Sequence, residues 1–82
     1  MIDAIREIIE VHGRLPVDVG TVPDDANLYT AGMSSHASVN VMLALEERFD
    51  VEFPDEMLTR QAFESVTAIR QSIVSLGVED EN

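Results

Sequence analysis

Two adjacent serines and a histidine, Ser34, Ser35 and His36, are the residues of this 82-residue chain whose types and spacing most suggest chemistry. A serine nucleophile beside a histidine base is typical of hydrolases. The nucleophile elbow of such enzymes, however, needs a glycine where His36 stands and a strand before the serine, and here a loop-like segment precedes it. Successive side chains on a helix point about 100° apart, so His36 is not aligned as a base for Ser35. We therefore expect no serine hydrolase.

The spacing of the possible metal ligands does not indicate a metal site. A calcium loop starting at Asp25 would have Tyr29 at a ligand position, Thr30 in place of the required glycine and His36 in place of the closing glutamate. The other histidine, His12, is far away in the sequence, and exposed or capping histidines are much commoner than two-ligand sites. The chain has no cysteine, which excludes thiolate ligands and disulfides. We expect no metal ion.

A covalently attached phosphate would suit a serine at the start of a helix. The helix N-terminus offers unpaired amide groups and partial positive charge, which compensate the charge of a phosphodiester. A simpler explanation is that Ser34 and Ser35 are a helix cap and its neighbour, because a serine oxygen can accept a hydrogen bond from the first free amides. The local pattern alone leaves both interpretations open.

The serines lie between a long loop and a helix. Residues 2–11 place isoleucines on one face and predict an amphipathic helix. Residues 13–33 contain glycine, proline, aspartate and asparagine too often for a regular element, so they predict a connection of about 20 residues. Within it, Leu28 and Tyr29 are expected to anchor the loop to the core in one short turn. Residues 34–50 again have helical periodicity and predict the second helix.

Two further helices follow a connector. Residues 50–54 alternate polar and apolar side chains, but a proline at their end favours an extended connector over a strand. A short helix is expected to begin with Asp55 as its cap, and the last helix covers residues 65–76, capped by Ser65 and ended by Gly77. These segments predict an all-α fold, a four-helix bundle of three longer helices and one short helix, with a long loop between helices one and two.

A single core should hold these helices together. Its expected members are the apolar residues that share the inward faces of the four helices and of the loops: Ile5, Ile8, Ile9, Leu28, Met42, Leu45, Phe49, Phe53, Phe63, Val66, Ile69 and Ile73. At this length one domain is expected. We assign residues 1–77 to it and residues 78–82 to a flexible acidic tail.

Acidic residues dominate the charge of the chain. Sixteen acids against five arginines give a net charge of −11, which argues against nucleic acid as a partner because phosphate binding requires basic patches. Six acids form an acidic belt that suits partners with basic surfaces: Glu46, Glu47, Asp50, Glu52, Asp55 and Glu56. No apolar run reaches the roughly 18 residues of a membrane span, and no leader opens the chain. We expect a cytoplasmic, soluble monomer without membrane contact.

Three runs of sequence carry a resemblance to a known family. They are LYTAGMSS at residues 28–35, VNVMLALEERF at residues 39–49 and FPDE at residues 53–56. The sequence resembles the acyl and peptidyl carrier proteins over nearly its whole length, since members of that family read G-x-D-S-L before the second helix, then A-L-E-E-x-F and I/F-P-D-E. The resemblance implies a four-helix bundle and a carrier function without catalysis of its own.

The resemblance also implies a cofactor and a set of site residues. The serine at the start of the family's second helix receives 4′-phosphopantetheine from a phosphopantetheinyl transferase, and the terminal thiol of this arm carries acyl or aminoacyl groups as thioesters to downstream acyl- or aminoacyl-transfer enzymes. By position that serine is Ser35, and Ser34 takes the place of the family's aspartate as the helix cap. The surface of the second helix is the expected partner-binding face, with these candidates: Met33, His36, Val39, Asn40, Leu43, Glu46 and Glu47.

The departures from the family pattern bear on the cargo. Ser34 replaces a carboxylate, His36 replaces a leucine, and Ala37 and Asn40 are neutral where fatty-acid carriers often have acids. The front of the second helix is therefore less acidic, which argues against a housekeeping fatty-acid carrier. The variant is similar to small stand-alone aminoacyl carrier proteins, which are charged by amino acid:carrier protein ligases that resemble the catalytic core of class II aminoacyl-tRNA synthetases.

Two alternatives remain beside an aminoacyl carrier. The first is a specialised acyl carrier for fatty-acid or polyketide-type synthesis, loaded by an acyl ligase or synthase. The second is an acidic helical interaction module without a covalent cofactor, in which the serines only cap the helix. Such a module has no need for an exposed Ser35, so the exposure of this hydroxyl distinguishes the two classes.

Overall fold

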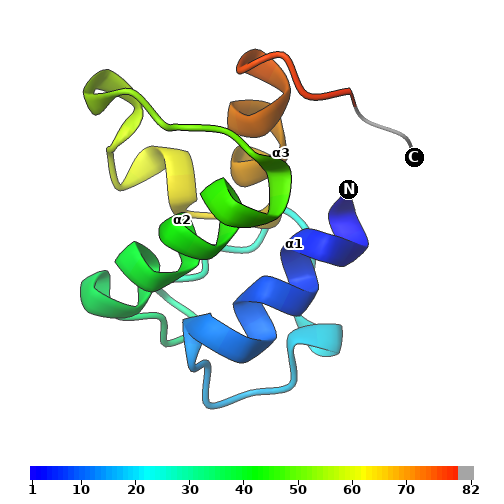
Figure 1. The fold of residues 1–82 in the computed structure, drawn as a ribbon. Helices are drawn as coiled ribbons and strands as arrows, with labels where there is room; N and C mark the ends of the chain where they lie inside the picture. Colours follow the sequence, from blue (N-terminus) through cyan, green and yellow to red (C-terminus); the bar gives the residue numbers. More distant parts are fainter. Residues whose placement is uncertain (80–82) are drawn as a thin grey trace.

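Three α-helices form the frame of the fold in the computed structural model, which describes residues 1–79 (Figure 1). They are α1 (Ile2–Ile8), α2 (Ser35–Phe49) and α3 (Val66–Ser75), and α1 packs against both of the others. The described residues contain no strand, which confirms the predicted all-α fold. None of the helices found within them is long and apolar enough to cross a membrane.

The first helix forms as predicted, but its last turn is wider and extends two residues beyond the predicted range of 2–11. α1 continues into a π-helical segment, η1 (Ile9–Gly13), which packs against α2, and Arg14 then leaves the helix in the left-handed conformation. The buried face contains Ile5, Ile8 and Ile9, as their spacing predicted.

The long loop is fixed by polar contacts that the sequence pattern did not reveal. It contains one 3-10 turn, η2 (Val19–Thr21), and the guanidinium of Arg6 donates hydrogen bonds of 2.7 Å to the carbonyl oxygens of Val19 and Val22. Arg6 also forms an ion pair with Asp24. Further along, the amide of Leu28 donates to the carbonyl oxygen of Glu64, and the Leu28 side chain is buried as expected. These contacts fix the loop that leads to Ser34.

The second helix has the predicted bounds but a different buried face. Its buried side chains are Ala37, Val41 and Leu45, whereas Met42 and Phe49, which were expected in the core, are only partly buried against it. Apolar residues occupy several sides of α2, so its periodicity does not determine which stripe is buried. The contacts with α1 and η1 determine it instead.

The short helix expected from Asp55 is absent. Residues 51–54 form an extended connector, as predicted, and two isolated 3-10 turns follow, η3 (Asp55–Met57) and η4 (Gln61–Phe63). The expectation that Asp55 caps a helix is wrong, because Pro54 occupies the capping position and no side chain accepts a hydrogen bond there. The fold is therefore three helices with 3-10 turns rather than three helices and a fourth short one.

The last helix agrees with its predicted signals. The Ser65 hydroxyl oxygen accepts a hydrogen bond from the amide of Ala68 at 3.0 Å, and Gly77 follows the helix at a φ of 96°. Val78, the first residue of the expected tail, packs partly against the core. Of the other residues of the expected tail, Glu79 is exposed, and residues 80–82 lie outside the described residues.

Candidate functional site

A turn fixed by Gly32 directs the chain into α2. Gly32 has a φ of 122°, and a Cβ atom added to it would lie 2.5 Å from Cδ of Pro16. Only glycine adopts this conformation without strain and leaves room for the proline ring. The next amide, that of Met33, donates to the carbonyl oxygen of Leu28 at 2.9 Å, which closes the turn just before the helix.

Ser34 occupies the N-cap position of α2. Its backbone is extended, with φ −77° and ψ 162°, and its hydroxyl oxygen accepts a hydrogen bond from the amide of Ala37 at 3.0 Å. The carbonyl oxygen of Ser34 accepts from the amide of Ser38 at 3.0 Å. Both acceptors of Ser34 are therefore used to begin the helix, which is the usual role of a serine at this position.

Ser35, by contrast, presents a hydroxyl that is available for chemistry. It is the first residue of α2 and is exposed to solvent. Among residues 1–79, its hydroxyl makes no hydrogen bond, and the amides of Ser35 and His36 donate to no protein acceptor. No acidic residue lies in the first turn. An anion attached here would meet two free amides and the positive end of the helix dipole.

A groove of about 290 Å³ opens beside Ser35. One wall is the side of α2 that carries Val39 and Met42, and the other is formed by Leu58 and by Phe63 of η4. Tyr29 and Arg60 also line it, with Cζ of Arg60 3.9 Å from the centroid of the Tyr29 ring, and Ser38 and Thr59 complete the lining. Sequence reasoning did not find Arg60, because it lies 25 positions after Ser35 in an irregular segment whose path no periodic pattern predicts.

The predicted partner-binding residues do not all lie on the surface. Those with exposed side chains are His36, Val39, Leu43 and Glu47, and Asn40 is partly buried. Met33 is only 3% exposed and belongs to the core, so its assignment to the partner surface is corrected. The closed turn before α2 directs this side chain inward, where its sulfur lies close to Gly13.

Glu46 is partly engaged within the protein itself. It is partly buried, and its Oε2 atom accepts a hydrogen bond of 2.9 Å from the amide of Phe53. This contact ties the extended connector to the last turns of α2. Glu46 therefore has a structural role as well as the predicted position near the partner surface.

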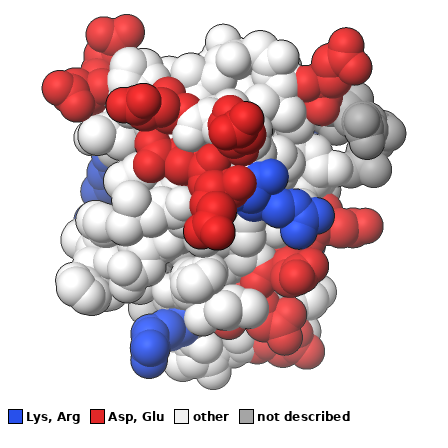
Figure 2. Space-filling view, in the orientation of Figure 1, with Lys and Arg blue, Asp and Glu red and all other residues white. Residues whose placement is uncertain are grey.

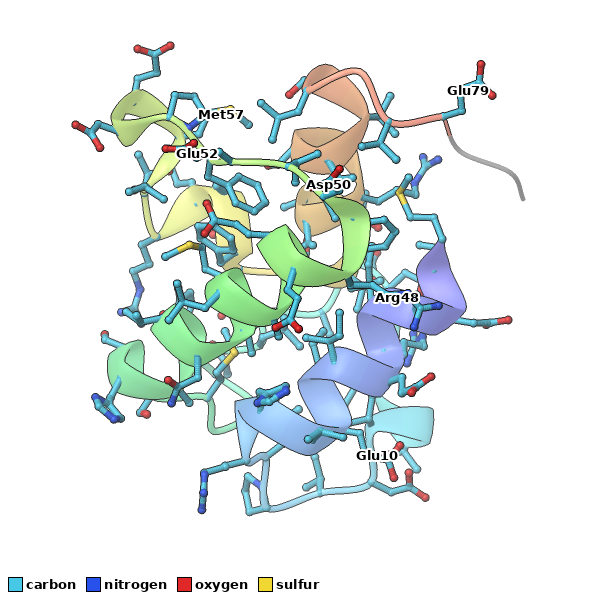
Figure 3. The ribbon with its side chains drawn as sticks, viewed as in Figure 1. Glu10, Arg48, Asp50, Glu52, Met57 and Glu79 are labelled. Carbon is cyan, nitrogen blue, oxygen red and sulfur yellow. The ribbon has the colours of Figure 1, made fainter. Side chains whose placement is uncertain are left out.

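Acidic side chains are distributed unevenly along the exposed side of α2. Figure 2 shows acidic side chains over the C-terminal end of α2 and the loop after it, while uncharged side chains cover the N-terminal half of the helix. Figure 3 shows Asp50 and Glu52, two members of the acidic belt, close to the end of α2. No acidic residue lines the groove beside Ser35, where Arg60 is the charged residue, and the acidic belt lies further along the helix.

Within residues 1–79 no group of three or more histidine, cysteine, aspartate or glutamate side chains is arranged to hold a metal ion.

Comparison with known proteins finds a matching protein family and a similar carrier protein. Residues 3–73 match a protein family described as the phosphopantetheine attachment site. The chain is 52% identical over 69 residues to the aminoacyl carrier protein of Agrobacterium fabrum, a match that covers 84% of this chain and 83% of that protein.

Two solved structures contain chains that are similar to this one in sequence and fold. One is a crystal structure of an engineered Bradyrhizobium japonicum glycine:[carrier protein] ligase complexed with a carrier protein from Agrobacterium tumefaciens and AMP. The match has a TM-score of 0.89 and 50% identity, and it covers 90% of this chain and 99% of the matched chain. Another, of the Bradyrhizobium japonicum ligase complexed with glycylated carrier protein, matches with a TM-score of 0.66 and 31% identity, over 87% of this chain and 90% of the matched chain.

Proposed function

The chain belongs to the family of phosphopantetheine-binding carrier proteins, and we propose that it is an aminoacyl carrier whose arm is attached to Ser35. The terminal thiol of the bound 4′-phosphopantetheine holds the cargo as a thioester. The observation that supports Ser35 as the attachment site is the difference between the two serines. The Ser34 hydroxyl caps the helix, whereas the Ser35 hydroxyl is exposed and makes no hydrogen bond within the described residues. As a carrier, the chain is a substrate of its partner enzymes rather than a catalyst.

The residues around Ser35 fit a phosphodiester. The amides of Ser35 and His36 have no protein acceptor within the described residues, and the first turn of α2 holds no acid that would repel the phosphate. In this respect Ser34 is better suited than an aspartate, since it caps the helix without adding a negative charge. The exposure of Ser35 also favours a carrier over the alternative of a docking module without a covalent group.

The likeness to the Agrobacterium fabrum protein favours an amino acid as the cargo over a fatty acyl group. Glycine is the first amino acid to test, because similar carriers were crystallised with a glycine:[carrier protein] ligase. We propose three kinds of partner: a phosphopantetheinyl transferase that delivers the arm from coenzyme A, an ATP-dependent amino acid:carrier protein ligase, and an enzyme that accepts the aminoacyl group. Because coenzyme A and ATP supply these reactions, we assign the protein to the cytoplasm.

The docking face for these partners is the exposed side of α2 next to Ser35. Val39 and Leu43 are 51% and 53% exposed and lie beside His36 on a part of the helix that carries little charge. Exposed apolar side chains next to a reactive group are typical of a protein-binding surface. Glu47 extends this face toward the acidic belt, where a basic partner surface would gain electrostatic attraction.

Loading of the holo protein tests the proposed function. Protein treated with a broad-specificity phosphopantetheinyl transferase and coenzyme A is incubated with ATP, glycine and a glycine:[carrier protein] ligase, and in parallel with a fatty-acyl loading system. We expect a glycyl addition in the intact mass that hydroxylamine removes, as it removes thioesters. The matched control, Ser35→Ala, should gain neither arm nor glycine.

Two results would contradict the proposal. Loading by the fatty-acyl system alone would overturn the aminoacyl assignment and favour the specialised acyl carrier. Folded protein that gains no arm at all would overturn the carrier function itself.

A further inference from the structure

The groove beside Ser35 has apolar walls that solvent reaches. Val39 is 51% exposed and Leu58 44% exposed, and the two lie on opposite sides of an opening that extends from Ser35 toward η4. Leu58 directly follows η3, and its side chain lies at the surface. A ligand that covered both side chains would remove apolar surface from water, which is favourable.

Arg60 is the charged residue of this groove, and its position is defined. Its guanidinium stacks over the Tyr29 ring, with Cζ 3.9 Å from the ring centroid. Within the described residues Arg60 forms no ion pair, since the recorded salt bridge joins Arg6 to Asp24. Stacking occupies one face of the guanidinium and leaves its in-plane N–H groups free to donate.

The groove around Arg60 is free of acids, although the chain contains 16 acids and has a net charge of −11. No aspartate or glutamate lines the groove, although both kinds of residue are frequent elsewhere on the surface. An exposed cation surrounded by neutral side chains has an electrostatic preference for an anion that enters the groove. Ser35 lines the same groove, so an anion attached to its hydroxyl would begin there.

We infer that Arg60 binds the phosphodiester of the arm on Ser35 and that the groove between α2 and η4 holds the adjoining, branched apolar part of the arm. This inference rests on the proposed function. The in-plane N–H groups of Arg60 donate to the phosphate oxygens, and Val39 and Leu58 cover the dimethyl group that follows the phosphate in the arm.

The test compares apo and holo protein by two-dimensional NMR, after intact mass has established that Ser35 is modified. We expect attachment to shift amide resonances of Tyr29, Val39 and Phe63 as well as those of residues 34–38, and to shift the Nε–H resonance of Arg60. In Arg60→Gln these distant shifts should shrink, because the ion pair that holds the arm in the groove is lost. The ratio of bound to free arm should fall by up to about fivefold, which is the most that an exposed ion pair contributes. The phosphorus resonance of the holo protein should move in the same variant.

A matched variant separates the contact from the change in net charge. Arg48 lies in the last turn of α2, at the other end of the helix from Ser35, and Arg48→Gln removes one positive charge there (Figure 3). Holo Arg48→Gln should keep the distant shifts and the phosphorus resonance of the original protein. The melting temperature of apo Arg60→Gln should fall by no more than about 8 °C, because the exposed cation–π contact with Tyr29 that it loses contributes about 0.5–1 kcal/mol.

The possible results distinguish failure of the proposed carrier function from failure of the inference about Arg60. If no arm is added to Ser35, the proposed function and this inference both fall. If the arm is added but shifts are confined to residues 34–38, or if Arg60→Gln keeps the distant shifts in full, the inference alone falls and the carrier function stands.

Discussion

Replacing Ser34 by alanine should destabilise the fold while leaving Ser35 competent to receive its arm. The change removes the hydrogen bond of 3.0 Å from the amide of Ala37 to the Ser34 hydroxyl oxygen. Loss of a serine cap costs about 1 kcal/mol, within a range of about 0.5–2 kcal/mol. For a domain of this size that cost corresponds to a fall in melting temperature of about 4–8 °C. Urea denaturation followed by circular dichroism measures the free energy of unfolding.

Two further alanine variants make the comparison specific. Ser35→Ala removes an exposed hydroxyl that bonds to nothing in the described residues, so the free energy of unfolding should change by less than about 0.5 kcal/mol. Ser65→Ala removes the equivalent cap of α3, where the amide of Ala68 donates to the hydroxyl oxygen at 3.0 Å. Ser65 is only 8% exposed, so this loss should be at least as large as that of Ser34→Ala.

The reasoning fails if the order of these effects differs. Ser34→Ala with the stability of the unmodified chain would mean that the cap contributes nothing. A larger loss for Ser35→Ala than for Ser34→Ala would mean that the roles of the two serines are reversed.

Three other substitutions test separate contacts. Gly32→Ala should lower the free energy of unfolding by about 2–4 kcal/mol, from backbone strain and a steric clash; a loss below about 0.5 kcal/mol in urea denaturation would contradict the account of this turn. Glu46→Ala should cost about 1–2 kcal/mol by leaving the Phe53 amide unpaired, and equal stability would show that this bond is unimportant. Leu43→Asp should raise the KM of the loading ligase about tenfold, with little effect from Val74→Asp on α3; equal effects of the two would argue against the docking face.

The sequence was sufficient to predict where α2 and α3 begin and where α3 ends. Ser34 and Ser65 precede periodic segments and cap them as expected, and Gly77 ends the last one. These signals are local, since a cap, a stop and a periodic face involve residues within a few positions of one another. Ser35 could likewise be singled out from its position after the cap together with the family resemblance.

Features that depend on contacts between distant segments could not be predicted. Met33 was assigned to the partner-binding face, but the turn before α2 directs it into the core. The stripe of α2 that is buried, centred on Val41, is chosen by α1 and η1 rather than by the sequence of α2. Arg60 meets Tyr29 beside Ser35 only because the chain after α2 folds back in two 3-10 turns, and no residue pattern encodes that path.

Mapping the attachment site is the most direct test of the central claim. Unmodified protein, Ser34→Ala and Ser35→Ala are each incubated with a phosphopantetheinyl transferase and coenzyme A, and then analysed by intact mass and peptide mapping. The account predicts one arm on Ser35 in the unmodified protein and in Ser34→Ala, and none in folded Ser35→Ala. An arm on Ser35→Ala, or its absence from folded protein in which Ser35 is intact, would contradict it.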